Sequence, residues 1–162
     1  MAARFRIRVA EANDAAALEP LERRCFSDPW SEAGLREMLA SPHVISRVAE
    51  RGASIAGYAF ARWVTTTGEI MNLAVAPEER RKGLARQLLE AVLEGLLARG
   101  VEEVFLEVRV SNQAAQALYL SRGFQVAGMR RAYYRKPTED ALVLRLQLPS
   151  VAEKGHGKRI FG

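Results

Sequence analysis

Residues 69–108, EIMNLAVAPEERRKGLARQLLEAVLEGLLARGVEEVFLEV, decide the fold of this chain. In the middle of the stretch, Leu84, Leu88 and Val92 recur every four residues, which places apolar side chains on one face of a helix. The pattern predicts a helix over Gly83–Arg99 that a glycine ends. Apolar runs typical of strands flank it on both sides. Because strand, helix and strand follow one another, we expect a βαβ unit with parallel strands.

The segments before this unit predict a strand, two helices and a β-meander. Alternating apolar residues over 5–9 indicate the strand, and Asp14 is a plausible N-cap for a helix over 15–24. Pro20 is expected to kink or restart that helix, because an interior proline removes a backbone hydrogen bond. Ser31 caps a short second helix. The meander follows from 43 to 75, with turns expected at Arg51-Gly52 and Thr67-Gly68.

The segments after the unit predict one more helix and two strands. Asn112 is a candidate N-cap for the helix QAAQALYLSR, and FQVAG and ALVLRLQL form the last strands around a polar loop over 129–140. We therefore expect a single mixed α/β domain over 1–149. The tail, 150–162, lacks apolar periodicity and is expected to be flexible.

The composition excludes several classes of protein. With 49% hydrophobic and 27% charged residues and no long apolar run, the chain shows neither a membrane span nor a signal peptide, so we expect a cytoplasmic protein. Cys25 is the single cysteine, and no residues stand at zinc-ligand spacing, so we expect no metal. The net charge of +5, part of it in the tail, is mild, so we do not expect nucleic-acid binding to be the primary role.

The loop before the long helix is a candidate anion site. Four backbone N–H groups at a helix N-terminus lack intrahelical acceptors, and the helix dipole adds positive charge there. Gly83 allows a phosphate to approach the backbone, and cations cluster around it at Arg80, Arg81, Lys82 and Arg86. The alternative is that these side chains simply extend into water. The spacing matches neither the Walker nor the dinucleotide-binding glycine motif.

LAVAPEERRKGLARQLLEAVL and FLEVRVSNQAAQALYLSRGF together resemble the GNAT superfamily of N-acetyltransferases. The acetyl-CoA signature [QR]-x-x-G-x-[GA] is matched by Arg80, Gly83 and Ala85. The resemblance implies a mixed, mostly antiparallel twisted sheet of about seven strands flanked by about four helices, with a parallel pair at the acetyl-CoA site. It covers nearly all of the chain except the tail.

The resemblance also implies residues that bind the cosubstrate acetyl-CoA. The pantetheine arm would lie along the main chain of Leu73, Ala74 and Val75. Asn112 would bond the cofactor beyond the diphosphate. The diphosphate itself would be bound by the N–H groups of Arg81, Lys82, Gly83, Leu84, Ala85 and Arg86.

Two residues are candidates for proton transfer. Acetyl transfer to an amine needs a base for the ammonium and an acid for the departing thiolate. Glu107, near the end of a strand, is the candidate base, and Tyr119 is the candidate acid. Without the resemblance, periodicity favours Tyr119 as a core aromatic residue, and Glu107 could be an ion-pair partner of Arg109 or a surface residue. Cys25 is better explained as a structural thiol than as a nucleophile, because no activating group lies nearby in sequence.

Within the superfamily, CFSDPWSEAGL and RRAYYRKPTEDALVL look most similar to the RimI type, which acetylates the N-terminal alanine of ribosomal small-subunit protein 18. FSDPWS departs from a tighter Phe-Pro-Trp-Ser form. Trp30, Tyr133 and Tyr134 are candidates to contact the acceptor peptide, although two adjacent tyrosines could also be hairpin packing. Glu139 and Asp140 could pair with a basic peptide or only end a loop.

The expected activity is therefore N-α-acetylation of a protein N-terminus, with a small-molecule amine or a lysine as the alternative acceptor. An α-amine is ~10% neutral at pH 7 and a lysine amine only ~0.04%, so the α-amine asks less of a base. An acyl-CoA-binding regulatory module without turnover and a nucleic-acid-binding domain are further alternatives. We favour a monomer that acts on a ribosomal protein, with no membrane partner.

Overall fold

The computed structural model describes residues 4–150, so the tail expected to be flexible lies, except for Ser150, outside the described residues. The strands are β1 (Arg6–Val9), β2 (Val44–Arg51), β3 (Ser54–Val64), β4 (Thr67–Val75), β5 (Glu103–Arg109), β6 (Gln125–Tyr134) and β7 (Glu139–Gln147). The helices are α1 (Ala15–Cys25), α2 (Glu32–Ala40), α3 (Leu84–Ala98) and α4 (Gln113–Ser121), with 3-10 turns η1 (Ala12–Asp14) and η2 (Pro77–Glu79).

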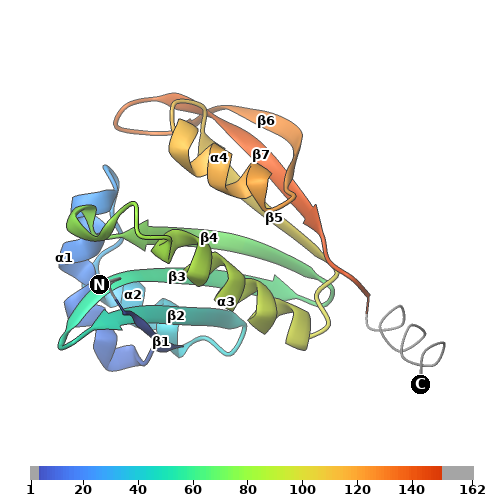
Figure 1. Ribbon diagram of the computed structural model, residues 1–162. Helices are drawn as coiled ribbons and strands as arrows, with labels where there is room; N and C mark the ends of the chain where they lie inside the picture. The colour runs from blue at the N-terminus through green and yellow to red at the C-terminus, as the bar shows by residue number, and fades with distance from the viewer. Residues whose placement is uncertain (1–3, 151–162) are drawn as a thin grey trace, which may run out of the picture.

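All of the strands form one 7-stranded sheet in the order β1-β2-β3-β4-β5-β7-β6 (Figure 1). Every neighbouring pair is antiparallel except β4 and β5, which are joined through α3 and run parallel. The mixed, mostly antiparallel sheet with one parallel pair that the sequence predicts is therefore confirmed.

The parallel pair is short. Strands β4 and β5 pair only from Thr67 to Glu69 on one side and from Glu103 to Phe105 on the other. Beyond these residues β4 continues beside β3 and β5 continues beside β7. The sheet therefore splits into two parts whose inner edges face each other.

Helices cover both faces of the sheet. In Figure 1, α3 lies in front of β2, β3 and β4, with α1 and α2 behind them. The buried face of α3 includes Leu84, Leu88, Leu89 and Val92, in the rows that the sequence predicts. A fully buried leucine contributes about 2 kcal/mol to stability through the hydrophobic effect. The burial of this face therefore holds α3 on the sheet.

A second apolar cluster fills the space under α1 and α2. It contains Leu18 and Leu35 from these helices and Tyr58 and Phe60 from β3, all of them fully buried. The two clusters lie on opposite faces of the sheet, so the central strands are buried on both sides.

Several local predictions need correction. Helix α1 continues through Pro20 and does not restart there, because the carbonyl that loses its partner belongs to the exposed Ala16, where water can replace it. The turn between β3 and β4 lies at Thr65–Thr66, two residues before the predicted turn at Thr67-Gly68. The loop expected over 129–140 is much shorter, because β6 pairs with β7 as far as Tyr134.

Replacing Gly57 with alanine is expected to destabilise the fold by roughly 1–3 kcal/mol. A Cβ at this position of β3 would lie 2.7 Å from the backbone oxygen of Ala74 and 3.0 Å from Leu88 Cδ1. Urea unfolding measures the effect. Gly128→Ala is the matched control, because a Cβ there meets nothing within 4 Å. Equal unfolding midpoints for the two variants would show that β3 and β4 are not packed as described.

Candidate active site

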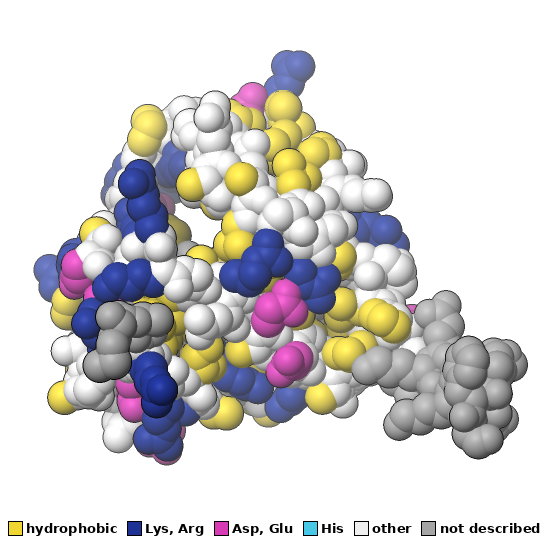
Figure 2. Space-filling view, viewed as in Figure 1, with side chains coloured by type: hydrophobic (Ala, Val, Ile, Leu, Met, Phe, Trp, Pro, Cys, Tyr) yellow, Lys and Arg dark blue, Asp and Glu magenta, His cyan; other side chains and the backbone are white. Residues whose placement is uncertain are grey.

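A cavity of about 730 Å³ occupies the place where β4 and β5 separate. Its walls come from α1 and the α1–α2 loop, from the open edges of the two strands, from α4 and from the end of β6. Figure 2 shows the molecule hollowed between the part that carries α4 and the part that carries α3. Among the predicted site residues, those that line the cavity are Trp30, Leu73, Glu107, Asn112, Tyr119, Tyr133 and Tyr134.

The edge of β4 that faces the cavity carries the residues expected to hold a pantetheine arm. Leu73 lines the cavity, while the side chains of Ala74 and Val75 are buried. The Val75 carbonyl already accepts a hydrogen bond from Arg80 Nε at 3.1 Å. Main-chain groups earlier in the segment are therefore better placed than the Val75 carbonyl to receive a ligand.

The loop at the start of α3 presents unpaired amides. Gly83 has φ +79° and Arg81 has φ +64°, and Gly83 serves as the N-cap without a side-chain hydrogen bond. Among residues 4–150, no hydrogen bond uses the N–H groups from Arg81 to Arg86 as donors. Their acceptors would have to come from outside the helix, which makes this end of α3 able to bind an anion.

The cations around the loop differ in how they are held. Arg80 bonds the Val75 carbonyl, Lys82 Nζ lies 3.1 Å from Glu79 Oε1, and Arg86 donates to the Ser121 hydroxyl. Arg81 is exposed and makes no hydrogen bond or ion pair within the part of the chain that the structure describes. The cluster is therefore only partly neutralised by the protein itself.

Glu107 lies on β5 with its side chain 13% exposed, and its Oε1 is 3.2 Å from Arg130 Nε. The ion pair weighed from the sequence, with Arg109, is not the one that forms. Burial raises the pKa of the Glu107 carboxyl, Glu69 raises it further, and Arg130 opposes both. A carboxyl with a raised pKa binds a proton more readily than an ordinary one.

Tyr119 on α4 is 7% exposed and packs edge-on against Phe124, with 5.6 Å between the ring centroids. Within residues 4–150 its hydroxyl makes no hydrogen bond, although the residue lines the cavity. Burial raises the pKa of this hydroxyl well above its usual range, so it keeps its proton at neutral pH. Asn112 caps α4, with its Oδ1 accepting from Ala115 N at 3.1 Å, and its amide nitrogen can still donate to a ligand.

The acceptor side of the cavity is held together by Arg109. Its guanidinium lies 4.4 Å from the Tyr134 ring centroid and donates to Ser27 Oγ at 3.2 Å. It also lies 3.2 Å from Glu139 Oε1. Burial, with smaller effects from neighbouring charges, raises the pKa of Tyr134 to about 12. Arg109 therefore joins the α1–α2 loop to the β6–β7 hairpin.

Glu139 and Asp140 make hydrogen bonds within the protein. Besides Arg109, Glu139 accepts from Ser111 N at 2.6 Å, and Asp140 accepts from Ala132 N at 2.8 Å. The sequence left open whether these two acids pair with a basic peptide or end the loop. Their contacts show that they hold the hairpin.

Sequence reasoning missed Glu22, a buried carboxylate that lines the same cavity. It is 1% exposed and accepts from Trp30 N at 2.9 Å, from Asn72 Nδ2 at 2.9 Å and from the Tyr58 hydroxyl. Burial raises its pKa, and these three donors oppose the rise. The available signal was an acid on the apolar face of α1, beside Leu18 and Leu21.

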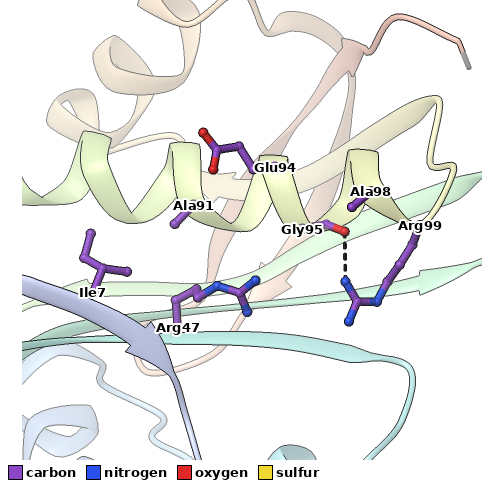
Figure 3. Close-up of a pocket in the computed structure, with 7 residues that line it drawn as sticks. All are labelled: Ile7, Arg47, Ala91, Glu94, Gly95, Ala98 and Arg99. Carbon is purple, nitrogen blue, oxygen red and sulfur yellow. Dashed lines mark hydrogen bonds between the residues drawn. The ribbon is translucent and has the colours of Figure 1, made fainter.

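A second cavity, of about 460 Å³, lies beside the C-terminal half of α3 and contains none of the predicted site residues. Figure 3 shows Arg47 and Arg99 pointing toward each other below the helix. Arg99 Nη1 donates to the Gly95 carbonyl at 3.1 Å, and Arg47 Nη1 donates to the Ser46 carbonyl at 2.9 Å. Because cations are favoured at a helix C-terminus, Arg99 stabilises the end of α3.

With this geometry established, comparison with known proteins identifies the family. A profile of the Acetyltransferase (GNAT) family matches residues 15–124. The chain belongs to the GNAT acetyltransferase family. As a GNAT protein it is an acyltransferase, and the split between β4 and β5 lies inside the matched region.

Curated relatives show which GNAT proteins this chain is similar to. The ribosomal protein bS18-alanine N-acetyltransferase of Escherichia coli (strain K12) is 37% identical over 142 residues, which cover 85% of this chain and 94% of the relative. N-alpha-acetyltransferase RimI of Mycobacterium tuberculosis is 40% identical over 138 residues, which cover 82% of this chain and 85% of that protein. The resemblance to the RimI type seen in the sequence is thus confirmed.

Solved structures share the fold. The crystal structure of the Escherichia coli ribosomal-protein-S18-alanine N-acetyltransferase has a TM-score of 0.82 at 35% identity and covers 89% of this chain and 94% of its own. Arabidopsis thaliana NAA60 in complex with acetyl-CoA has a TM-score of 0.82 at 17% identity and covers 90% of this chain and 99% of its own. The second likeness shows the fold alone.

Within residues 4–150, no helix has both the length and the apolar character needed to cross a membrane. Over the same residues, no three His, Cys, Asp or Glu side chains cluster as metal ligands would.

Replacing Glu22 with alanine is expected to destabilise the protein by roughly 2 to 4 kcal/mol, because three buried donors lose their acceptor. Chemical denaturation measures the loss. Glu19→Ala on the same helix is the control, since Glu19 forms only an i,i+4 pair with Arg23 and its loss should cost under about 0.5 kcal/mol. Similar losses for both variants would contradict the role assigned to Glu22.

Proposed function

We propose that this GNAT enzyme transfers the acetyl group of acetyl-CoA to the N-terminal amine of a protein, and that the acceptor is the N-terminal alanine of ribosomal protein bS18. The names of the relatives that match over most of the chain support this acceptor. An acceptor of this kind places the reaction in the cytoplasm. The observation that carries the proposal is that Glu107 from β5 and Tyr119 from α4 line one cavity at the split between the strands.

The residues at the split fit acetyl-CoA. The open β4 edge at Leu73 and Ala74 would hold the pantetheine arm, with Val75 contributing less because its carbonyl is already bonded. The free amides from Arg81 to Arg86 would bind the diphosphate, and Arg81 would add an unpaired positive charge. The Asn112 amide nitrogen remains available beyond them. Bound there, acetyl-CoA supplies a reactive thioester at the cavity.

Glu107 removes a proton from the acceptor ammonium, directly or through one water. Its raised pKa makes Glu107 a better base than an ordinary carboxylate. On the acceptor side, an α-amine with a pKa near 8 gives up its proton more easily than a lysine with a pKa near 10.4. Tyr119 supplies a proton to the departing thiolate, because its buried hydroxyl stays protonated and has no partner in the described protein.

Trp30, Tyr133 and Tyr134 form the walls on the acceptor side. Trp30 stacks on Phe60 with centroids 6.3 Å apart, so its position is fixed by the core. The Tyr133 and Tyr134 rings pack edge to face, with their centroids 5.0 Å apart and their planes at 88°. Rigid aromatic walls of this kind suit a small first side chain such as alanine.

An acetylation assay with acetyl-CoA and a basic peptide starting with alanine tests the proposal. We expect one acetyl group at the N-terminus, located by mass spectrometry, and a loss of roughly 100-fold or more in kcat for Glu107→Gln and for Tyr119→Phe. The two variants should still bind acetyl-CoA, because neither residue lies at the diphosphate loop.

The controls separate the two kinds of acceptor. A peptide with a blocked N-terminus and free lysines should not react, and peptides starting with serine or methionine measure the breadth of the acceptor site. Acetylation of the blocked peptide, or of small amines alone, would replace the proposal by lysine or small-molecule acetylation.

Gly83→Val is expected to weaken acetyl-CoA binding by roughly tenfold or more, equivalent to about 1.4 kcal/mol. A side chain at Gly83 would project into open space, where the diphosphate is proposed to lie. Gly100→Val is the matched control, because Gly100 has φ +83° and equally open space at the other end of α3. Both variants carry the same backbone strain, about 1–2 kcal/mol. Calorimetric titration should show weaker binding for Gly83→Val alone.

A further inference from the structure

Glu107 belongs to a row of charged side chains on the face of the sheet opposite α3. Residues paired across strands share a face, and so do alternate residues of one strand. Glu69 pairs with Arg62 on β3 and with Phe105 on β5, two residues before Glu107. These residues therefore lie on one face of the sheet.

The same register brings Arg130 to this face from the far side. Arg130 on β6 and Arg109 on β5 both pair with Ala141 of β7, and Glu107 pairs with Val143. The small side chain of Ala141 lets the Arg130 guanidinium reach across β7 toward Glu107. Register alone explains why residues from β3, β4, β5 and β6 meet.

The contacts divide this row into two ion pairs. Arg130 Nε lies 3.2 Å from Glu107 Oε1, and its guanidinium lies 5.7 Å from the Tyr133 ring centroid. Arg62 Nη2 lies 3.0 Å from Glu69 Oε2. Arg62 and Glu69 line the cavity together with Glu107, so the second pair faces the acceptor.

We propose that Arg130 and Glu69 are positioning residues for Glu107, with Arg130 anchoring its carboxylate across β7 and Glu69 placing a second carboxylate beside it from β4. The inference rests on the proposed role of Glu107 as the base. It adds two residues that the sequence did not single out.

The two neighbours act on Glu107 in opposite directions. Burial is the largest cause of its raised pKa, Glu69 raises the pKa further, and Arg130 lowers it, with a smaller lowering from Arg62. The remaining charged or titratable groups around the cavity are Glu22, Cys25, Asp28, Arg109, Tyr119, Tyr133, Tyr134 and Arg135.

The sign of each effect on activity follows. A base works in its ionised form, so kcat/KM falls as the pH drops through the pKa of the base in the free enzyme. Replacing Arg130 by methionine removes a positive charge, raises the pKa of Glu107 and moves the acid limb to higher pH. Replacing Glu69 by glutamine removes a negative charge, lowers that pKa and moves the acid limb to lower pH.

The test measures kcat/KM for an alanine-initiated peptide across the acid and neutral range in Arg130→Met, Glu69→Gln and Arg131→Met. Because Arg130 is 58% exposed, water screens its effect, and we expect a loss of roughly two- to fivefold at the acid end for Arg130→Met. Glu69→Gln should show a gain there. Arg131→Met is the control, since Arg131 is an exposed neighbour with no ion pair in residues 4–150.

Opposite shifts support the proposal, because damage to the fold would lower activity in the same direction for both variants. Shifts of the same sign, no shift in either, or an equal shift in Arg131→Met would overturn it. Carbon-13 NMR of the glutamate carboxyls, with the Glu107 signal assigned by Glu107→Gln, reads the same titration without turnover. If no peptide is acetylated, the proposed function fails, while the NMR shifts still decide whether Arg130 and Glu69 act on Glu107.

Discussion

The separation of β4 from β5 is the constraint on which the rest of the site depends. The two strands pair with each other over three residues each and then separate, while β4 stays paired with β3 and β5 with β7. Every backbone group on the inner edges beyond that point lacks a strand partner among the described residues, and unpaired backbone groups favour a ligand that can bond them. The cavity, the proposed cofactor slot and the place of Glu107 all lie along those edges. A sheet paired along the full length of β4 and β5 would close all three.

Charge is distributed unevenly along this split. At the start of α3, the amides and the Arg81 side chain, which have no partner within residues 4–150, create a positive end suited to a diphosphate. Where the strands part, Glu69 and Glu107 lie on the face away from α3 and are balanced by Arg62 and Arg130. A two-ended site of this kind can bind an anionic donor and a cationic acceptor without bringing their charges together.

Two residues fix the α1–α2 loop and the β6–β7 hairpin on the acceptor side. Glu22 fixes the backbone at Trp30 to the strands beneath it, and Arg109 ties the α1–α2 loop to the β6–β7 hairpin. Neither needs to touch a substrate to matter. Both set the shape of the cavity: Glu22 is a buried acceptor for three donors, and Arg109 links segments that are distant in the chain.

The sequence by itself determined the βαβ unit, the apolar face of α3, the glycine at its N-cap and the N-caps of α2 and α4, because each depends on residues close together in the chain. It also carried the family resemblance and pointed to Glu107 and Tyr119. It did not predict that Tyr133 and Tyr134 lie on a strand or that α1 continues through Pro20. Nor did it predict the contacts made by Glu22, Glu69, Arg109 and Arg130. These outcomes depend on strand register and on burial between segments distant in the chain, such as the 50 residues between Glu22 and Asn72. Only the tertiary structure decides which charges meet, because a side chain's partner is set by which strands lie side by side and not by its neighbours in sequence.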